Sequence, residues 1–313
     1  MHRPRRSRRN SWLAGRERIT LSNMCTTLAE HRANNLEGLC KFSRLRHTVD
    51  RLIPGRGSEG IERLEAVLKG QSFSLHRHDT YAIGLTLAGV QTFHYRGVRR
   101  YSLPGQCHIL HPDEAHDGTP GTEGGFRYRI LYLDPALVQE ALGGKSLPFV
   151  SEPVVSFSAS RLISLKRLWD LDDEIDELGR MDIIELALDA LMAASSRPIG
   201  SGRLSMEGLN RARAIIAADP AKRHSVGALE KVAQLDRWTL ARQFRVAFGT
   251  SPSRYRTMRQ LNIVRRLIIS GVPLVEASFR AGFADQSHMT RQFRKAFGLA
   301  PGHWTRAAGR AHR

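Results

Sequence analysis

The same short helical segment occurs twice in this chain of 313 residues, and this duplication constrains the fold more than any other feature. Residues 242–249 read Arg-Gln-Phe-Arg-Val-Ala-Phe-Gly, and residues 291–298 read Arg-Gln-Phe-Arg-Lys-Ala-Phe-Gly. The correspondence continues outward without a gap, so that Asp236 matches Asp285. Chance similarity does not keep one register over about thirty residues. The chain therefore contains two copies of one structural unit.

Each copy is expected to contain a short helix, a turn and a second helix whose first turn is capped by the matched aspartate. The second helices are expected at about 237–248 and 286–297, with an apolar face and a polar face. A helix in the DNA major groove requires such a polar front, because arginine, glutamine and threonine side chains can read base edges. The residues expected to contact DNA are Arg237, Trp238, Arg242 and Arg245 in the first copy and Gln286, Ser287, Thr290 and Arg291 in the second.

An ordinary amphipathic helix with a solvated polar face would explain one such segment, but it does not explain a duplication with glycine at both helix ends. The distribution of charge supports DNA binding. Residues 201–313 contain 21 Lys and Arg against 6 Asp and Glu, a net charge of +15, whereas residues 51–200 contain 16 against 20, a net charge of −4. Positive charge around the repeat suits the phosphate backbone of double-stranded DNA. The sequence therefore predicts two helix-turn-helix units.

Residues 205–306 resemble the double helix-turn-helix domain of AraC/XylS-family transcription regulators. The resemblance rests on Leu240-x3-Phe244-x3-Phe248-Gly249 in the first copy and on Gly282-Phe283-x-Asp285 and Phe293-x3-Phe297-Gly298 in the second. It implies two recognition helices on one face of the duplex, a connecting helix near 252–270, and a promoter or operator as the target. RNA polymerase is a further candidate partner. Residues 307–313 are expected to form a tail.

Two features depart from the family pattern. Glu230 and Gln234 stand in the first turn region, where Ala or Gly is usual. This turn must be made without the residue that adopts a left-handed backbone most easily, a strain of about 1 kcal/mol. Gln260 replaces the arginine that is usual in the connecting helix.

A different pattern occurs within the domain expected at 49–196: from Phe73 to Asp134 apolar and polar residues alternate with a period of two, and glycine or proline turns separate the runs. This pattern predicts an antiparallel β-barrel or jelly roll. His76-x-His78, Pro104-Gly105 and Pro112-x3-His116 are similar to the cupin barrel that serves as the sensor domain in many of these regulators. The predicted fold class is α+β: a cupin-like antiparallel β-barrel followed by helices, and then an all-α domain with two helix-turn-helix units.

Three histidines raise the question of a metal. His76 and His78 are expected on one face of a strand with His116 on a neighbouring strand, and Zn²⁺ or Fe²⁺ accepts three imidazoles. The carboxylate that metal cupins place a few residues later is absent, since Asp79 lies too close to the histidine pair. The prediction is therefore no metal, no other cofactor and no catalytic residue, with the histidines lining a pocket. A cupin-type metalloenzyme with an appended nucleic-acid-binding module is the alternative function.

The barrel is expected to hold a small-molecule effector, because alternating strands direct aromatic and imidazole groups toward one interior. A filled core without a ligand is the alternative, since small barrels are often packed solid. The resemblance favours the sensor role and leaves the effector unidentified. The expected effector-binding residues are His76, His78, Tyr81, Phe93, Tyr95, His108, His116 and Tyr132.

Helical patterns follow the barrel at 135–142 and at about 158–195. In the resembling regulators such helices commonly pair two subunits, so a homodimer is expected. Residues 197–204 are expected to form the linker to a separable DNA-binding domain.

Residues 1–48 begin with an arginine-rich stretch and are expected to be a disordered basic extension, with a DNA-touching arm as the alternative. No run of eighteen apolar residues, as a membrane span requires, occurs in the sequence. The cysteines Cys25, Cys40 and Cys107 are scattered and odd in number, which is typical of reduced thiols in a cytoplasm. The sequence therefore predicts a cytoplasmic, ligand-responsive transcription regulator.

Overall fold

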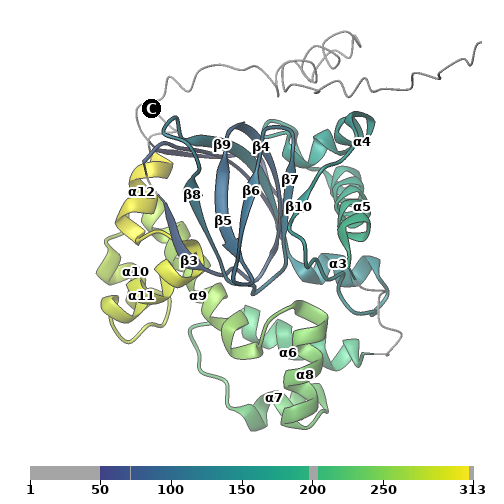
Figure 1. Cartoon of the computed structure of the whole chain (residues 1–313). Coiled ribbons are helices and arrows are strands. Elements are labelled where there is room, and N and C mark those ends of the chain that lie inside the picture. Colours follow the sequence, from purple (N-terminus) through teal and green to yellow (C-terminus); the bar gives the residue numbers. More distant parts are fainter. Residues whose placement is uncertain (1–49, 71, 197–203, 310–313) are drawn as a thin grey trace, which may run out of the picture. The chain divides into compact units, whose positions relative to one another are not determined.

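The computed structural model describes residues 50–70, 72–196 and 204–309. The expected extension at 1–48 and all but the last residue of the expected linker lie outside these residues. The described chain forms a sandwich of β-strands, helices that follow it, and a C-terminal set of helices (Figure 1). The predicted α+β class is therefore confirmed.

Two antiparallel sheets make up the sandwich, with the strand orders β1-β2-β9-β4-β7-β10 and β3-β8-β5-β6. Between β5 and β6 the chain turns through Arg96 and Gly97, which both have positive φ, as a tight two-residue hairpin requires. The strands are β1 Arg51–Pro54, β2 Ile61–Leu68, β3 Phe73–His76, β4 Tyr81–Gly89, β5 Gln91–Tyr95, β6 Val98–Ser102, β7 Cys107–Leu110, β8 His116–Pro120, β9 Phe126–Leu133 and β10 Val154–Val155.

The larger sheet is buried on both faces. Its outer face carries Tyr81, Ile83 and Leu85 of β4, and it packs against the helices that follow the sandwich. Its inner face carries smaller β4 residues, of which Ala82 belongs to the core between the sheets. The covering helices are α3 Pro135–Ala141, α4 Ala159–Ser164, the 3-10 helix η1 Leu165–Trp169 and α5 Glu177–Ala194.

The C-terminal domain consists of two helix-turn-helix units joined by one long helix, α9 Pro252–Ile269. Tyr255 of α9 packs into the core of the first unit, whereas Met258 and Leu261 pack into the core of the second. The expected connecting helix therefore joins both units. The other helices are α6 Met206–Ala218, α7 Val226–Ala233, α8 Arg237–Phe248, α10 Leu274–Arg280, α11 Gln286–Phe297 and α12 Pro301–Gly309.

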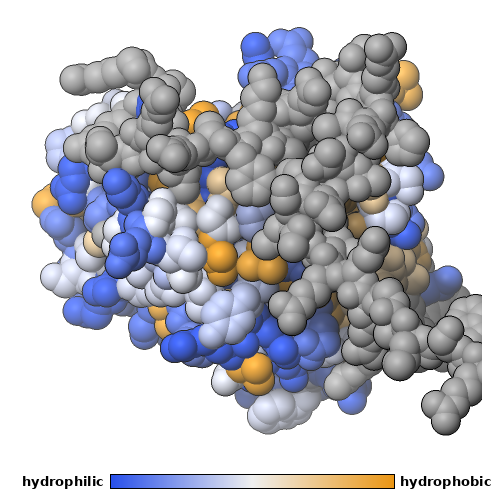
Figure 2. Space-filling model, turned by 45° about the horizontal axis from the view of Figure 1, so that its top comes forward, coloured by the Kyte–Doolittle hydropathy of each residue, from blue (hydrophilic) through white to orange (hydrophobic). Residues whose placement is uncertain are grey.

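The C-terminal helix extends beyond the expected domain boundary. Helix α12 passes residue 306 without a break and ends at Gly309, and its Ala307 is buried. Ala307 and Leu299 share a hydrophobic cluster with Leu52 of β1, so the sandwich and the DNA-binding domain are in apolar contact. On the face seen in Figure 2 the described surface is mainly hydrophilic, with small, separate hydrophobic areas.

Candidate nucleic-acid interface and effector cavity

The two expected recognition helices are α8 and α11, and both have the bounds that the sequence predicts. Asp236 accepts hydrogen bonds from the backbone N–H groups of Trp238 and Thr239, and Asp285 accepts one from His288. Each helix ends at a glycine with a φ of +71°. The repeated caps fix where each helix starts and stops, because they satisfy the terminal N–H groups and provide the left-handed residue at the end.

The polar faces of these helices remain open to solvent. Leu240 and Phe244 are buried beneath α8, and Met289 and Phe293 occupy the same positions beneath α11. Trp238 is 80% exposed on α8. Of the other expected DNA contacts, Gln286 and Thr290 are half-buried, and the exposed ones are Arg237, Arg242, Arg245, Ser287 and Arg291.

The two units differ where α11 meets the sandwich. Arg294 is exposed on the polar face of α11 and donates two hydrogen bonds to the Ser74 hydroxyl on β3, at 3.1 and 2.9 Å. Its counterpart in the first copy, Arg245, is likewise exposed. Phe297 is half-buried at the junction with the sandwich, whereas its counterpart Phe248 is buried.

Both departures from the family pattern have a structural role. Gln234 ends α7 in the left-handed region, with a φ of +56°, so the first turn carries the strain expected of a residue with a Cβ. Gln260 is buried, and its amide donates to the carbonyls of Ala281 and Gly282 at 2.9 and 3.1 Å. The glutamine thereby ties the connecting helix to the turn of the second unit.

Substitution of either matched arginine, Arg242→Ala or Arg291→Ala, should weaken specific DNA binding by about 1–3 kcal/mol, because each loses a forked contact to a base edge. A fluorescence-anisotropy titration with a selected operator would measure this loss. Arg99 is an exposed arginine on β6 of the sandwich, and the control variant Arg99→Ala should bind as the original chain does. Unchanged affinity in both helix variants would show that these faces do not read DNA.

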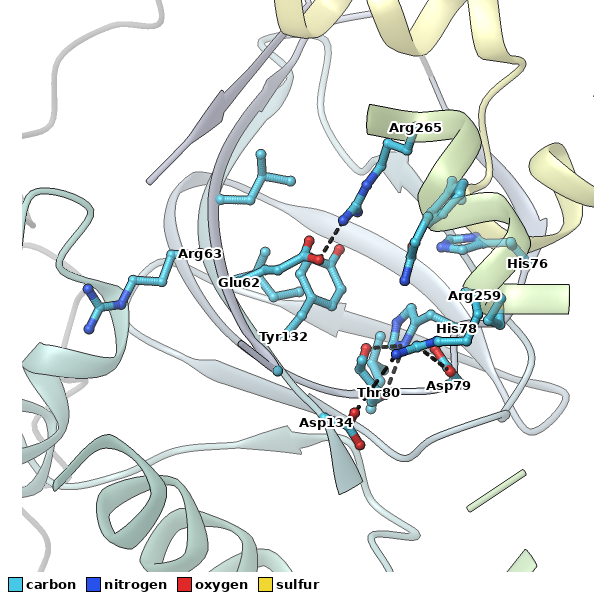
Figure 3. Close-up of a pocket in the computed structure, with 18 of the residues that line it drawn as sticks. Glu62, Arg63, His76, His78, Asp79, Thr80, Tyr132, Asp134, Arg259 and Arg265 are labelled. Atoms are coloured by element: carbon cyan, nitrogen blue, oxygen red, sulfur yellow. Dashed lines mark hydrogen bonds and ion pairs between the residues drawn. The ribbon is translucent and has the colours of Figure 1, made fainter. Parts of the chain in front are cut away.

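A cavity of about 890 Å³ lies between the sheets and opens toward the C-terminal domain. Six of the eight expected effector residues line it: His76, His78, Phe93, His108, His116 and Tyr132. The C-terminal domain adds Tyr255, Met258, Asn262 and Trp304 to its wall. Both domains therefore enclose one site, with aromatic walls and polar groups directed into it (Figure 3).

Two expected effector residues do not line this cavity. Tyr81 lies on the outer face of β4, and its hydroxyl donates to the Pro148 carbonyl at 2.6 Å. The Tyr95 hydroxyl donates to the Val150 carbonyl at 2.9 Å, which fixes the ring away from the site. An alternating pattern does not distinguish the two faces of a strand when both are buried, and this is why the expectation for Tyr81 was wrong.

Three of the four histidines of the expected set, His76, His78 and His116, meet at the mouth of the cavity. The His116 ring lies 4.2 Å from that of His76 and 4.8 Å from that of His78, measured between centroids. The Nδ1 atom of each ring lies 2.8–2.9 Å from a backbone carbonyl, which selects the Nδ1–H tautomer in a neutral imidazole. Burial lowers the pKa of His78 to about 3 and that of His116 to about 4, so these rings are neutral at pH 7.

The arrangement of these rings does not form a metal site. Across residues 50–70, 72–196 and 204–309, no three His, Cys, Asp or Glu side chains are placed to hold a metal ion together. The histidines instead form a neutral polar patch at the entrance to the cavity.

Ion pairs between the domains surround this entrance, and the sequence did not reveal them. Arg259 of α9 donates to Asp79 at 2.7 Å and also lies 3.9 Å from Asp134. Arg265 pairs with Glu62, as Figure 3 shows. Two further pairs, Arg213–Asp134 and Arg254–Asp113, complete the set at 3.2 and 2.7 Å. The one feature of the sequence that could have indicated these ion pairs was the arginine-rich polar face of α9. Its positive charge alone would instead suggest that this face binds DNA.

The sandwich also contacts the ends of both recognition helices. Backbone N–H groups of Ser74 and Arg77 donate to the carbonyls of Gly298 and Lys295 at the C-terminal end of α11. At the end of α8, a Cβ on Gly249 would collide with Pro112, which follows β7. The duplicated glycines are therefore needed both for their backbone conformation and for close contact with the sandwich.

Comparison with known proteins agrees with this two-part architecture. The family described as "AraC-like ligand binding domain" matches residues 59–186, and the family described as "Helix-turn-helix domain" matches residues 229–307. The chain is also similar to the uncharacterized HTH-type transcriptional regulator YbfI of Bacillus subtilis (strain 168). The two are 25% identical over 231 residues, which cover 70% of this chain and 82% of YbfI.

Among solved structures, the fold is similar to that of ToxT from Vibrio cholerae, with a TM-score of 0.59 and 9% identity. The match covers 80% of this chain and 99% of ToxT. A second ToxT structure, with an unsaturated fatty acid bound, matches with a TM-score of 0.57 and 10% identity over 79% of this chain and 95% of that one. At such low identity the likeness concerns the fold alone.

Proposed function

Since this chain belongs to the AraC family of transcription regulators, with a ligand-binding domain before a helix-turn-helix domain, we propose that a small molecule in the interdomain cavity controls its engagement of DNA. The single observation that carries this proposal is that residues of both domains line one cavity of about 890 Å³. A ligand there contacts the sensor and the DNA-binding domain at once. Its affinity therefore depends on how the two domains are placed, which is the condition for control.

Strand β3 supplies a physical route between ligand and DNA. At its end, His76 lines the cavity. From the same strand, Ser74 bonds to Gly298 and Arg294 at the end of the recognition helix α11. A ligand that shifts the imidazoles would move the groups that hold this helix. The fatty acid bound in ToxT is consistent with a ligand role for this fold.

This function is tested by ligand capture with the full chain. The protein is incubated with a small-molecule extract, washed and denatured, and the released compounds are identified by mass spectrometry. The variant His78→Ala should capture several-fold less of the specific compound, because it removes a polar group from the mouth of the cavity.

Tyr95→Phe is the control in this experiment, since the Tyr95 ring lies outside the cavity wall. A captured compound should also change the affinity for a selected operator in a mobility-shift assay. If no compound retained by the original chain alters DNA binding, ligand control is wrong.

We further propose that α5 pairs two subunits. Leu178, Met181, Leu188 and Met192 fall at the a and d positions of a heptad pattern along this helix, in which Glu185 fills the intervening position and Leu188 also packs against the core beneath. Leu178 and Met181 are 72% and 63% exposed, although they belong to a helix whose other face is buried against the sandwich. The occupant that fits an exposed apolar seam of this kind is the same helix of a second copy.

The double variant Leu178→Glu/Met181→Glu should convert a dimer to a monomer, because four charges would face one another across the seam. Sedimentation velocity at micromolar concentration would measure the change. Val98→Glu, at an exposed apolar position on the edge strand β6, should leave the dimer intact. If only Val98→Glu produced monomers, the subunits would pair through β6 instead.

We expect the regulator to act in the cytoplasm, where its DNA target lies, and to bind RNA polymerase as a further partner. Within the described residues, no helix is both long and apolar enough to cross a membrane. We propose no catalytic activity for the chain, since one matching family is described as a ligand binding domain and the other as a helix-turn-helix domain, and neither description names a reaction.

A further inference from the structure

A buried histidine inside the cavity indicates the chemistry of the effector. His108 is 1% exposed and lines the cavity from β7. Within the part of the chain that the structure describes, neither of its ring nitrogens has a hydrogen-bond partner. The Oε1 atom of Gln91, another buried residue of the cavity wall, also has none. Buried polar groups in native proteins are rarely left without partners, because each unmade bond is costly.

The packing around His108 prevents the ring from turning to a protein partner. On the neighbouring strand β4, a Cβ at Gly84 would collide with Cε1 and Nε2 of this ring. The rings of Phe93 and Tyr128 flank it, with centroids at 6.1 and 5.6 Å. Burial lowers the pKa of His108 to about 3, so at pH 7 the ring is neutral, with one donor nitrogen and one acceptor nitrogen.

Three arginines at the cavity entrance are already paired with carboxylates. Arg259 pairs with Asp79, Arg265 with Glu62, and Arg213 with Asp134. A charged ligand head placed against His108 and Gln91 would lie beside uncharged groups, because the flanking residues Phe93 and Tyr128 carry no charge either. A buried charge without a partner is unfavourable.

We propose that the effector is an uncharged molecule with a flat apolar body and a polar head that both donates and accepts hydrogen bonds, such as an amide or a hydroxyl, placed against His108 and Gln91. This inference rests on the proposed control by a ligand in the same cavity. The oxygen of the head would accept a hydrogen bond from the donor nitrogen of His108, and its N–H or O–H group would donate to Gln91 Oε1. The body would lie among Phe93, Tyr128 and the other aromatic rings of the wall.

Three compounds with one body test the class: 2-naphthamide, 2-naphthoate and 2-naphthylmethylammonium, titrated calorimetrically into the full chain at pH 7. The amide should bind at least about ten-fold more tightly than either ion, because a site built for hydrogen bonds discriminates strongly against ligands that leave its groups unpaired. His108→Leu should lower the affinity for the amide by about ten- to a hundred-fold. His108→Gln keeps a donor and an acceptor and should retain most of the affinity.

His111→Leu is the matched control, because His111 is a half-buried histidine that follows β7 directly but lies outside the cavity wall. The control should bind the amide as the original chain does. Tighter binding of an ion, or equal binding of the amide by His108→Leu and the original chain, would overturn the uncharged class while leaving an effector cavity in place. If none of the three compounds bound at millimolar concentration, this inference would be overturned, whereas the proposed ligand control would still be decided by the capture experiment with the full chain.

Discussion

Replacement of Arg259 with alanine should lower the free energy of unfolding by about 3 kcal/mol, because it leaves Asp79 buried without its partner. The Asp79 side chain is only 5% exposed, whereas that of Arg259 is 22% exposed. Because Arg259 keeps some contact with water, the expected loss of unfolding free energy lies at the lower end of the range for a buried ion pair. Removal of Asp79 should cost less, about 1–2 kcal/mol, since the guanidinium keeps some water and lies 3.9 Å from Asp134. Urea unfolding followed by tryptophan fluorescence would measure both.

The dependence on pH gives this prediction a second readout. Burial raises the pKa of Asp79, and Arg259 opposes that rise. A carboxyl whose pKa is raised in the folded state binds more protons there than in the unfolded state. Its contribution to the free energy of unfolding therefore falls as the pH rises. Arg259→Ala removes the group that opposes this rise, so the pKa of Asp79 should rise further in the variant. The loss of unfolding free energy caused by Arg259→Ala should therefore be greater at pH 7 than at pH 5.

Arg56→Ala is the control for this substitution. It removes an ion pair with Glu174 whose side chains are 61% and 77% exposed, and such a pair contributes about 1 kcal/mol or less. Equal losses in Arg259→Ala and Arg56→Ala would mean that the interdomain pair does not hold the domains together.

Insertion of five base pairs between the two halves of a selected operator should lower affinity at least about 100-fold, because it turns one half to the opposite side of the duplex and removes the specific contacts of one helix. Anisotropy titrations at fixed salt would measure the loss. Arg242 and Arg291 lie on helices that α9 and the sandwich hold in one arrangement.

Insertion of ten base pairs distinguishes a fixed arrangement from a flexible one. It restores the face of the duplex but adds about 34 Å of length. We expect no recovery, since α9 cannot stretch to span that distance. Full recovery would show that the two units move independently on DNA.

The recognition helices could be predicted to the residue because their ends depend on local chemistry. Asp236 and Asp285 cap the first turns, and Gly249 and Gly298 take the left-handed conformation at the ends. The period-two pattern likewise predicted antiparallel strands, in a β-barrel or jelly roll. The residues that produce each of these signals lie within a few positions of one another in the chain, so a single sequence is enough to recognise them.

The cavity could be predicted only in part. His108 and Tyr132 were expected correctly as inward-facing residues, but Tyr81 packs outward because β4 is covered on both faces. The ion pairs at the cavity entrance were not predicted, because they join residues that are far apart in the chain. Arg259 and Asp79, for example, are 180 positions apart. Such pairs depend on how two domains dock, which no local periodicity encodes.

The sandwich contacts both repeats, and this contact affects how the two recognition helices fit the spacing of base pairs in DNA. Gly249 lies against Pro112 and Gly298 against Phe73, so the same sandwich sets the distance between the two recognition helices. One base-pair step is about 3.4 Å and turns the groove by about a tenth of a revolution. A displacement of one helix by a fraction of that step would put its arginines out of phase with the bases. The sensor can therefore switch binding by altering phase alone, without touching DNA or unfolding either helix.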